Sequence, residues 1–100
     1  MKLDKECLKD RYRCKLTKEL DSLAKLSESK YFYHYIVADN WCKKEKCLAV
    51  RVPGGTVGGV WIDDNNVITK IVIDTTYTVK TYPDNINDVI QKFVGEVIEY

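Results

Sequence analysis

The sequence predicts an α+β fold: a long N-terminal helix, an antiparallel sheet of four to five strands, and a C-terminal helix packed on the sheet. No Gly or Pro precedes Pro53, and a helical repeat of leucines occupies the first part of the chain. Short β-branched and aromatic runs separated by turn residues follow, and a second apolar repeat comes after Pro83. The chain of 100 residues has enough length for one core and too little for two, so residues 1–100 are expected to form a single domain.

The N-terminal helix is predicted over residues 2–26. At about 3.6 residues per turn, six apolar side chains in this range fall on one stripe, which should face the core. They are Leu8, Tyr12, Leu16, Leu20, Leu23 and Leu26. The run Ser27-Glu28-Ser29 ends the repeat.

Five strands are predicted between the two helices. Residues 31–38 and 47–52 are rich in β-branched and aromatic side chains, and the second run alternates between an aliphatic and a mixed face. The glycine-rich residues 53–59 are predicted to form a long hairpin loop. Further strands are predicted at 57–62, 67–73 and 76–82. Residues 63–66, Asp-Asp-Asn-Asn, should form a hairpin turn, because Asn and Asp tolerate positive φ.

The C-terminal helix is predicted to open at Pro83-Asp84-Asn85, with Asp84 as its N-cap. Its apolar face comprises Ile86, Val89, Ile90, Phe93 and Val97. Hairpin-length links between the strands imply an antiparallel sheet that is packed by helices on one face. The sequence does not decide whether both helices share that face.

The net charge of +1 argues against a strong global attraction to nucleic acid or to an anionic membrane. The charge is unevenly distributed: residues 1–50 carry twelve Lys/Arg and eight Asp/Glu, whereas residues 51–100 carry four and seven. The first half would suit an acidic partner and the second a basic one, unless both halves are ordinary solvated surfaces. No apolar run is long enough for a signal sequence or a membrane span, so we expect a cytoplasmic protein without a membrane partner.

The four cysteines, Cys7, Cys14, Cys42 and Cys47, allow several interpretations. They are free thiols in a reducing cytosol, they form disulfides that clamp the first helix to residues 42–47, or they contact a second subunit of a homodimer. Zinc is disfavoured, because two helical turns separate Cys7 and Cys14 too widely for one ion. Arg11 and Lys18 would lower the pKa of an exposed Cys14 thiol, which makes it the best candidate for a reactive thiol.

No motif for a reaction, a metal ion or a cofactor emerges. His34 is the only histidine, and it is expected to pack among aromatic residues rather than to serve a cysteine as a base. Residues 53–59 lack the lysine of a phosphate-binding loop and precede a strand. Residues 63–66 lack the glycine and the distal glutamate of a calcium loop. We therefore expect no enzymatic activity, no metal and no cofactor.

Surplus aromatic residues favour binding to another protein, since Tyr and Trp combine a large apolar area with a polar tip. The predicted partner-binding residues lie on the open sheet face and in the bend at 41–47: Tyr31, Tyr33, Tyr35, Trp41 and Trp61. The architecture alone is similar to that of small phage or mobile-element proteins that bind and block host enzymes. The leading prediction is a non-enzymatic protein-binding module that acts by surface complementarity.

Two alternatives stay open. Weak nucleic-acid binding would use a basic cluster beside Trp41, consisting of Lys43, Lys44, Lys46 and Arg51. A thiol-dependent redox protein would use Cys14 or Cys42.

Overall fold

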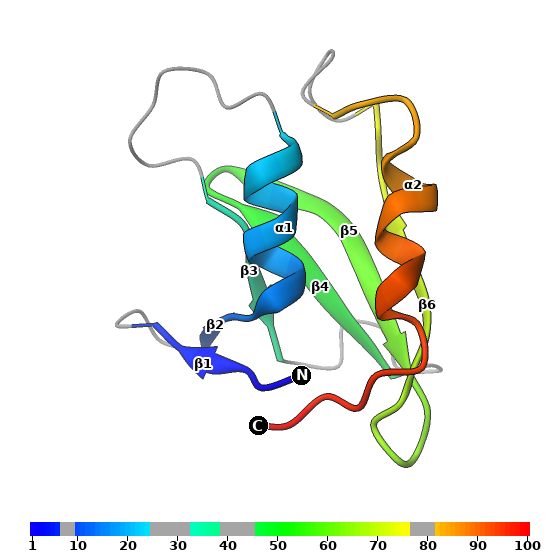
Figure 1. The fold of residues 1–100 in the computed structure, drawn as a ribbon. Coiled ribbons are helices and arrows are strands. Elements are labelled where there is room, and N and C mark those ends of the chain that lie inside the picture. The colour runs from blue at the N-terminus through cyan, green and yellow to red at the C-terminus, as the bar shows by residue number, and fades with distance from the viewer. Residues whose placement is uncertain (7–9, 25–32, 39–45, 77–81) are drawn as a thin grey trace.

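The computed structural model of the chain describes residues 1–6, 10–24, 33–38, 46–76 and 82–100. It confirms the α+β class with an antiparallel sheet (Figure 1). Over the described residues the sheet has six strands, more than predicted, and each pairs with the next along the chain in the order β1-β2-β3-β4-β5-β6. Within the described residues, no helix is long and apolar enough to cross a membrane.

The strands are β1 at Asp4–Lys5, β2 at Arg11–Arg13, β3 at Tyr35–Val37, β4 at Cys47–Val52, β5 at Gly55–Ile62 and β6 at Ile68–Ile73. The helix α1, Lys15–Leu23, follows β2 and precedes β3 in the chain. The C-terminal helix consists of α2 at Ile86–Val89 and the 3₁₀ turn η1 at Ile90–Phe93.

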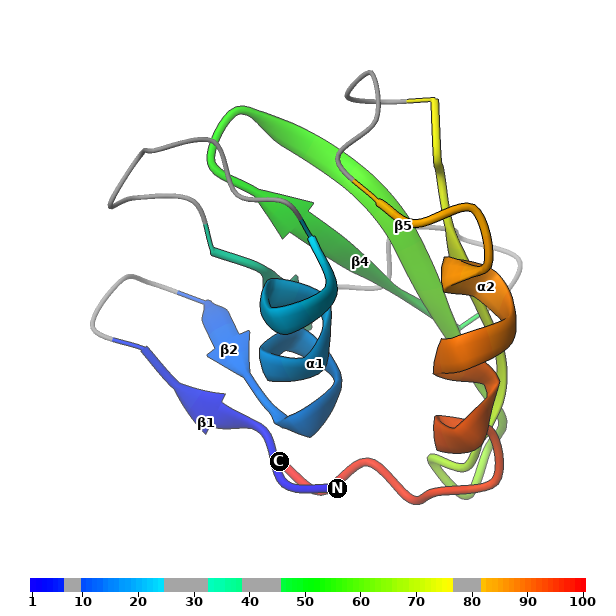
Figure 2. The same ribbon diagram turned by 45° about the horizontal axis from the view of Figure 1, so that its top comes forward.

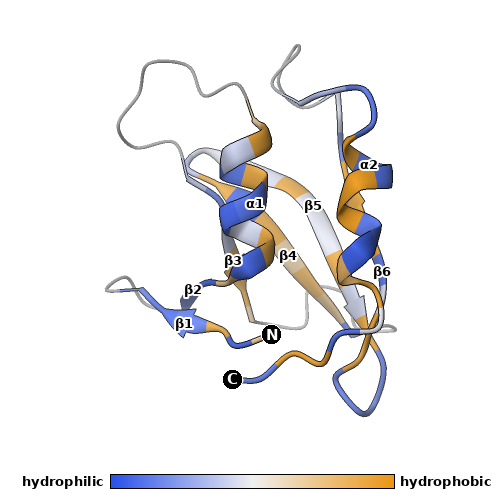
Figure 3. Cartoon of the chain, viewed as in Figure 1, coloured by the Kyte–Doolittle hydropathy of each residue, from blue (hydrophilic) through white to orange (hydrophobic). Residues whose placement is uncertain are grey.

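Both helices cover the same face of the sheet, which the sequence left undecided. Figures 1 and 2 show α1 and the C-terminal helix on one side of the strands. Their buried side chains join those of the strands in one core, which includes Leu16, Leu20, Ile36, Leu48, Val50, Val60, Ile71, Ile73, Ile86, Ile90 and Phe93. Figure 3 shows β4, in the centre, as mostly hydrophobic and β1, at the edge, as mostly hydrophilic. Burying each large apolar side chain contributes about 1.5–3 kcal/mol, so this core is what holds the helices on the sheet.

The predicted long N-terminal helix is wrong over its first half. The strands β1 and β2 lie there, and of the described residues in this range only Lys15–Leu23, nine residues, are helical. Tyr12 pairs with Ile36 of β3, and the alternation Arg-Tyr-Arg in β2 suits a strand that turns Tyr12 toward the core. Asp10, with φ of 59°, precedes β2 in a conformation that Asp tolerates. Backbone pairing with β3 therefore outweighs the helical repeat, a tertiary effect that periodicity does not report.

The helix α1 begins directly after Cys14, whose backbone is extended at φ −156° and ψ −177°. Thr17 satisfies this end of the helix: its Oγ1 accepts from the Cys14 N–H and donates to the Cys14 carbonyl, each at 2.8 Å. The Cys14 side chain in turn accepts from the Thr17 N–H, so the two residues form a capping box in which Cys14 stands where Ser or Thr is usual. Leu16 and Leu20 of the predicted stripe are fully buried, so the apolar pattern is correct within this shorter helix.

The middle of the chain follows the predicted strands more closely. β4 spans the predicted residues 47–52, and the turn at 63–66 is confirmed, with Asn66 at φ 61°. The long loop at 53–59 is wrong, because β5 begins at Gly55 and the turn consists of Pro53 and Gly54. Gly54 has φ of 106°, a value that favours glycine, and it lets the chain reverse in two residues.

Two predicted elements at the C-terminal end need correction. Most of the strand predicted at 76–82 lies outside the described residues, and neither Thr76 nor Tyr82 is in a strand. The C-terminal helix has Asn85 rather than Asp84 as its N-cap and ends at Phe93. Val97, which was predicted on the helix face, lies beyond the helix and forms an antiparallel bridge with Val67.

The outer edge of β6 is covered by side-chain amides of the C-terminal helix. The Oδ1 of Asn87 accepts from the Ile73 N–H at 2.8 Å, and its Nδ2 donates to the Ile73 carbonyl at 3.0 Å. The Nε2 of Gln91 donates to the Ile71 carbonyl at 3.2 Å. An amide that both donates and accepts imitates the peptide of a further strand, so it blocks edge-to-edge pairing at this position.

Replacing Asn87 by leucine should lower the free energy of unfolding by about 1–3 kcal/mol, because the N–H and the carbonyl of Ile73 lose their partners. The uncovered edge should also promote self-association that increases with protein concentration. Urea unfolding and sedimentation velocity measure the two effects. Asp88→Leu adds the same side chain at an exposed position of α2 and should change stability by no more than about 0.5 kcal/mol. Equal behaviour of the two variants would contradict the capping role.

The two ends of the chain lie side by side (Figures 1 and 2). The Leu3 N–H donates to the Glu99 carbonyl at 2.7 Å, and the Glu99 N–H donates to the Met1 carbonyl at 2.8 Å. Leu3 and Ile98 are buried in the core as a result. Residues 97–99 thus join the start of the chain to the start of β6.

Candidate functional site

We call the side of the sheet that is turned away from α1 and α2 the outer face. In β4, Leu48, Val50 and Val52 belong to the core under the helices, whereas the alternate residues Cys47, Ala49 and Arg51 point to the outer face. The strand register extends this division across five strands. One outer row consists of Arg11, Val37, Ala49, Gly59 and Val72. The row is small or apolar except at Arg11, which lies at one end.

Cations stack on the aromatic rings of the outer face. The guanidinium of Arg11 lies 4.5 Å from the centre of the Tyr35 ring, and its Nη1 donates to the Tyr33 hydroxyl at 3.2 Å. On the same face but toward the other edge of the sheet, the Nζ of Lys70 lies 4.5 Å from the ring centre of Trp61. Such contacts contribute about 0.5–1 kcal/mol each at exposed sites, and they order the cationic side chains before any partner binds.

The indole of Trp61 lies over Gly59. A Cβ at Gly59 would stand 3.1 Å from two atoms of the Trp61 ring and 2.9 Å from the Cys47 Sγ. Gly59 therefore makes room for the chain's own tryptophan. Beside the indole runs a shallow groove that Trp61, Val72 and Asp74 line, and Val72 is 38% exposed. The outer face thus carries an apolar strip next to its cations.

Two arginines of the outer face have no carboxylate partner among the described residues. Arg13 pairs with Asp21 at 2.6 Å and approaches Glu6 at 3.9 Å. Arg11 and Arg51 make no such pair with any described acidic group. The Nε of Arg51 is buried and also lacks a hydrogen bond. A buried donor without a partner costs free energy, so Arg51 is a residue that stability alone does not explain.

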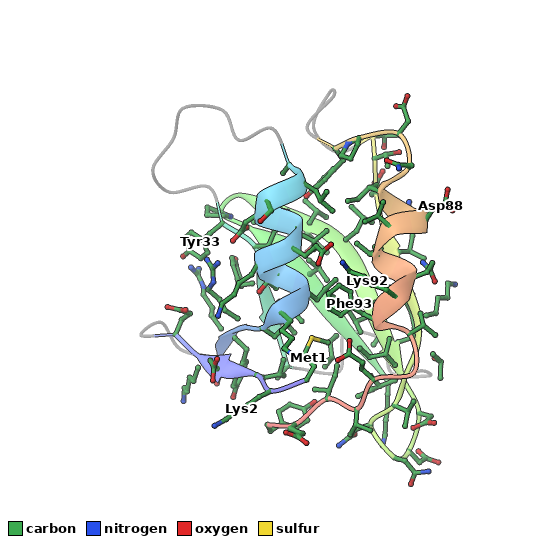
Figure 4. All side chains as sticks on the ribbon, in the orientation of Figure 1. Met1, Lys2, Tyr33, Asp88, Lys92 and Phe93 are labelled. Carbon is green, nitrogen blue, oxygen red and sulfur yellow. The ribbon has the colours of Figure 1, made fainter. Side chains whose placement is uncertain are left out.

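The predicted partner-binding residues differ in exposure. Tyr33 and Trp61 are half-buried on the outer face. Tyr35 is only 5% exposed, and its ring is covered by Arg11, so Tyr35 supports its neighbours and offers little surface itself. Tyr31 and Trp41 lie outside the described residues. Figure 4 shows Tyr33 at the opposite side of α1 from Lys92 and Phe93, which lie between the helices.

The predicted basic cluster is described only in part. Lys43 and Lys44 lie outside the described residues. Lys46 is exposed and pairs with the fully exposed Asp64 at 3.4 Å, a contact that solvent screens. Arg51 lies on the outer face. It is on β4, next to β3, and its direct cross-strand partner on β3 is Tyr35.

Of the four cysteines, Cys14 and Cys47 lie within the described residues, and both are buried. Cys14 is a free thiol, is only 1% exposed and lies in the core at the start of α1. Burial raises the pKa of the Cys14 thiol and outweighs the hydrogen bonds from Thr17 and Leu16 that lower it. The proposed reactive thiol required exposure, so Cys14 does not meet that condition. Cys47 is fully buried, and Cys7 and Cys42 lie outside the described residues.

A buried polar network around His34 is the main feature that the sequence did not predict. The ring Nδ1 of His34 lies 2.7 Å from the Asp21 Oδ1, which also accepts from the His34 N–H at 2.8 Å. The Nε2 lies 2.5 Å from the Tyr82 hydroxyl. Because a carboxylate only accepts, Nδ1 donates to Asp21, while Nε2 and the Tyr82 hydroxyl share the second hydrogen bond. His34 is fully buried, which agrees with the predicted packing role.

The carboxylate of Asp21 holds this network in its charged form. Burial, the largest single influence, would raise the pKa of Asp21. The hydrogen bonds from the His34 side chain and backbone, with the charges of Arg13 and His34, act against burial and together lower the pKa below its ordinary value. Asp21 therefore stays ionised and links α1 to the start of β3.

A second cavity lies between α1 and η1, on the other side of the molecule from the outer face. It is lined by Lys15, Lys18, Glu19, Ser22, Lys92, Phe93 and Glu96. Its charges are largely balanced, because Lys92 pairs with Glu19 across the cavity. Among the described residues, no group of three or more His, Cys, Asp or Glu side chains is arranged to hold a metal ion.

The sequence named Tyr33, Trp61 and Arg51 but missed Arg11 and Lys70 as their neighbours. The placement of Arg11 in a helix hid its role, since only the β2–β3 pairing brings it to Tyr35. The Trp61–Lys70 pair follows from the hairpin register, in which the two residues are directly opposite. Comparisons of this chain with models of protein families, with curated proteins and with solved structures found no match.

Proposed function

We propose that this protein is a small non-enzymatic module that binds another protein through the outer face of its sheet. The proposal rests on one observation: half-buried aromatic rings gather on the outer face with two arginines that have no carboxylate partner among the described residues. Aromatic and Arg side chains are the usual anchors of protein interfaces, whereas a stability role does not explain the buried and unsatisfied Arg51 Nε.

The arrangement of the cations favours a protein over a single-stranded nucleic acid. A base needs the free face of an aromatic ring to stack on. Here Arg11 lies over Tyr35, and Lys70 lies over Trp61. These cations occupy ring faces that a base would need, but their N–H groups remain available to acceptor groups of a partner. Inhibition of a host enzyme is one form that such binding takes, and it is suggested by architecture alone.

A photo-reactive amino acid placed at Val72 should cross-link to a protein in an extract of the cells that make this chain. The same group at Ser22, exposed on α1, is the matched control and should give no specific product. The Val72 product should withstand nuclease, disappear with protease, and weaken at least about tenfold in a Trp61→Ala variant, because large aromatic residues dominate interface energies.

Three outcomes would refute the proposal. They are equal cross-linking at Val72 and Ser22, a nuclease-sensitive product, and a Val72 product that Trp61→Ala leaves unchanged. Because Trp61→Ala also uncovers Gly59, the far-ultraviolet circular dichroism of the variant must match that of the unmodified chain.

A further inference from the structure

We infer that Arg11 and Arg51, on either side of Tyr35, form a seat for carboxylate groups of an acidic segment of the partner protein. The inference rests on the proposed function, since it names the chemistry of the partner that the outer face binds. It concerns the strands β2, β3 and β4 at the far side of the sheet from Val72 and its groove.

The strand order places the two arginines around one tyrosine. Tyr35 is on β3, Arg51 is its direct partner on β4, and Arg11 reaches over the Tyr35 ring from β2. Tyr35 is only 5% exposed, so it forms the floor between the two arginines. The Tyr33 hydroxyl accepts from Arg11 and restricts the guanidinium further. Both cations are thus held by a rigid sheet rather than by a loop, which lowers the entropy cost of binding an anion.

Acidic side chains of the described residues do not neutralise the positive charges of Arg11 and Arg51. Of the three arginines on these strands, Arg13 is the one with carboxylate partners among the described residues, namely Asp21 and Glu6. Arg11 and Arg51 have none among the described residues, and the Arg51 Nε is a buried donor without an acceptor. A guanidinium fork matches the two oxygens of a carboxylate, and a hydrogen bond between charged groups is stronger than a neutral one. An acidic side chain of a partner would offer carboxylate oxygens to the guanidinium groups of the two arginines.

A phosphate would also satisfy an arginine, so the test must separate a peptide from a nucleic acid. The chain is labelled with ¹⁵N, and a short polyglutamate peptide or an oligothymidylate of equal length is added at low salt. We expect polyglutamate to shift the Nε–H signals of Arg51 and Arg11. We also expect Arg51→Gln and Arg11→Gln each to weaken binding by about tenfold, the usual effect of losing a charged hydrogen bond.

Lys15→Gln and Lys18→Gln are the matched controls, because each removes one positive charge at an exposed site on α1 and should leave the affinity unchanged. Arg51→Gln should also leave the midpoint of urea unfolding unchanged or higher, since Arg51 has a buried donor that the fold does not satisfy. This second measurement distinguishes lost binding from lost folding.

Three results would overturn the carboxylate seat. They are unchanged Arg51 Nε–H signals with polyglutamate, equal weakening by the lysine and arginine variants, and tighter binding of oligothymidylate at the same two arginines. If the seat fails while Val72 still cross-links to a protein through Trp61, the proposed function survives with a different partner chemistry. If the specific cross-link at Val72 is absent as well, both the carboxylate seat and the proposed function are refuted.

Discussion

Replacing Gly58 by alanine should destabilise the chain by about 3 kcal/mol or more, one of the largest effects expected from a single methyl group. A Cβ at Gly58 would stand 2.3 Å from the carbonyl oxygen of Val72 and 2.8 Å from the Cδ1 of Ile73. The first contact is with backbone of the paired strand β6, which cannot withdraw without breaking its pairing with β5. The shift of register beside Gly58, where β5 inserts Val57, is associated with this close approach.

Gly59→Ala is the matched control for this prediction. Its Cβ would face the opposite side of the sheet and would meet the side chains of Trp61 and Cys47 at 3.1 Å and 2.9 Å. Side chains move more easily than a paired strand, so we expect a loss of about 1 kcal/mol, together with a change in tryptophan fluorescence as the indole is displaced. Urea unfolding measures both variants. Equal stability losses would show that Gly58 does not have the special role assigned to it.

Replacing Asp21 by alanine should lower the free energy of unfolding by about 3–5 kcal/mol. The carboxylate accepts from the Nδ1 and the backbone N–H of His34 and from Arg13, so its removal leaves several donors without an acceptor. His34 is fully buried, and water does not reach its ring to replace the lost bonds. Because a typical domain is stable by about 5–15 kcal/mol, this change would remove a large share of the total.

Glu19→Ala is the control for Asp21, since it removes the same charge from the same helix. Glu19 pairs with Lys92, which is more than half exposed, and such pairs contribute at most about 1 kcal/mol. Urea unfolding at neutral pH should therefore separate the two variants clearly. A loss in Asp21→Ala no larger than that in Glu19→Ala would contradict the importance of the His34 network.

The network also predicts a pH dependence. The folded-state pKa of Asp21 lies below the ordinary value of 3.8, so the unfolded chain binds a proton there more readily than the folded chain. The stability that this gives is fully present above about pH 3.8 and is lost as the pH falls through the lowered pKa. Asp21→Asn should remove this part of the acid sensitivity while other carboxylates, such as Asp74, act alike in both proteins. Parallel stability curves for Asp21→Asn and the unmodified chain at acid pH would exclude the assignment.

Local patterns account for the parts of the fold that were predicted well. The alternation in residues 47–52 and the Asp-Asp-Asn-Asn turn at 63–66 depend on neighbours in the sequence, and both are confirmed. The same reasoning failed at residues 2–26, where a leucine repeat has a helical period but β2 pairs with β3 instead. Within the described residues the helical repeat is accurate from Leu16 to Leu23, where the chain forms α1 and these leucines pack on the core.

The candidate site was predictable in its residue types and not in its arrangement. Tyr33, Trp61 and Arg51 stand out in the sequence as aromatic or cationic residues, and the structure places them on the outer face. Their neighbours were hidden, because Arg11 reaches Tyr35 only through the pairing of β2 with β3. The sequence also offered Tyr35 as an anchor, but burial under a guanidinium leaves it as a floor.

The sequence by itself determined the α+β class, the antiparallel central strands, and the apolar faces of the two helices, because each depends on periodicity and turn chemistry over a few residues. Only the tertiary structure decided that both helices share one face, that the backbone of β6 approaches Gly58 too closely for a side chain, and that His34 contacts Asp21 and Tyr82. Asp21 and Tyr82 lie 13 and 48 residues from His34 in the chain. Contacts at such separations form when packing brings the segments together, and no local pattern in the sequence records them.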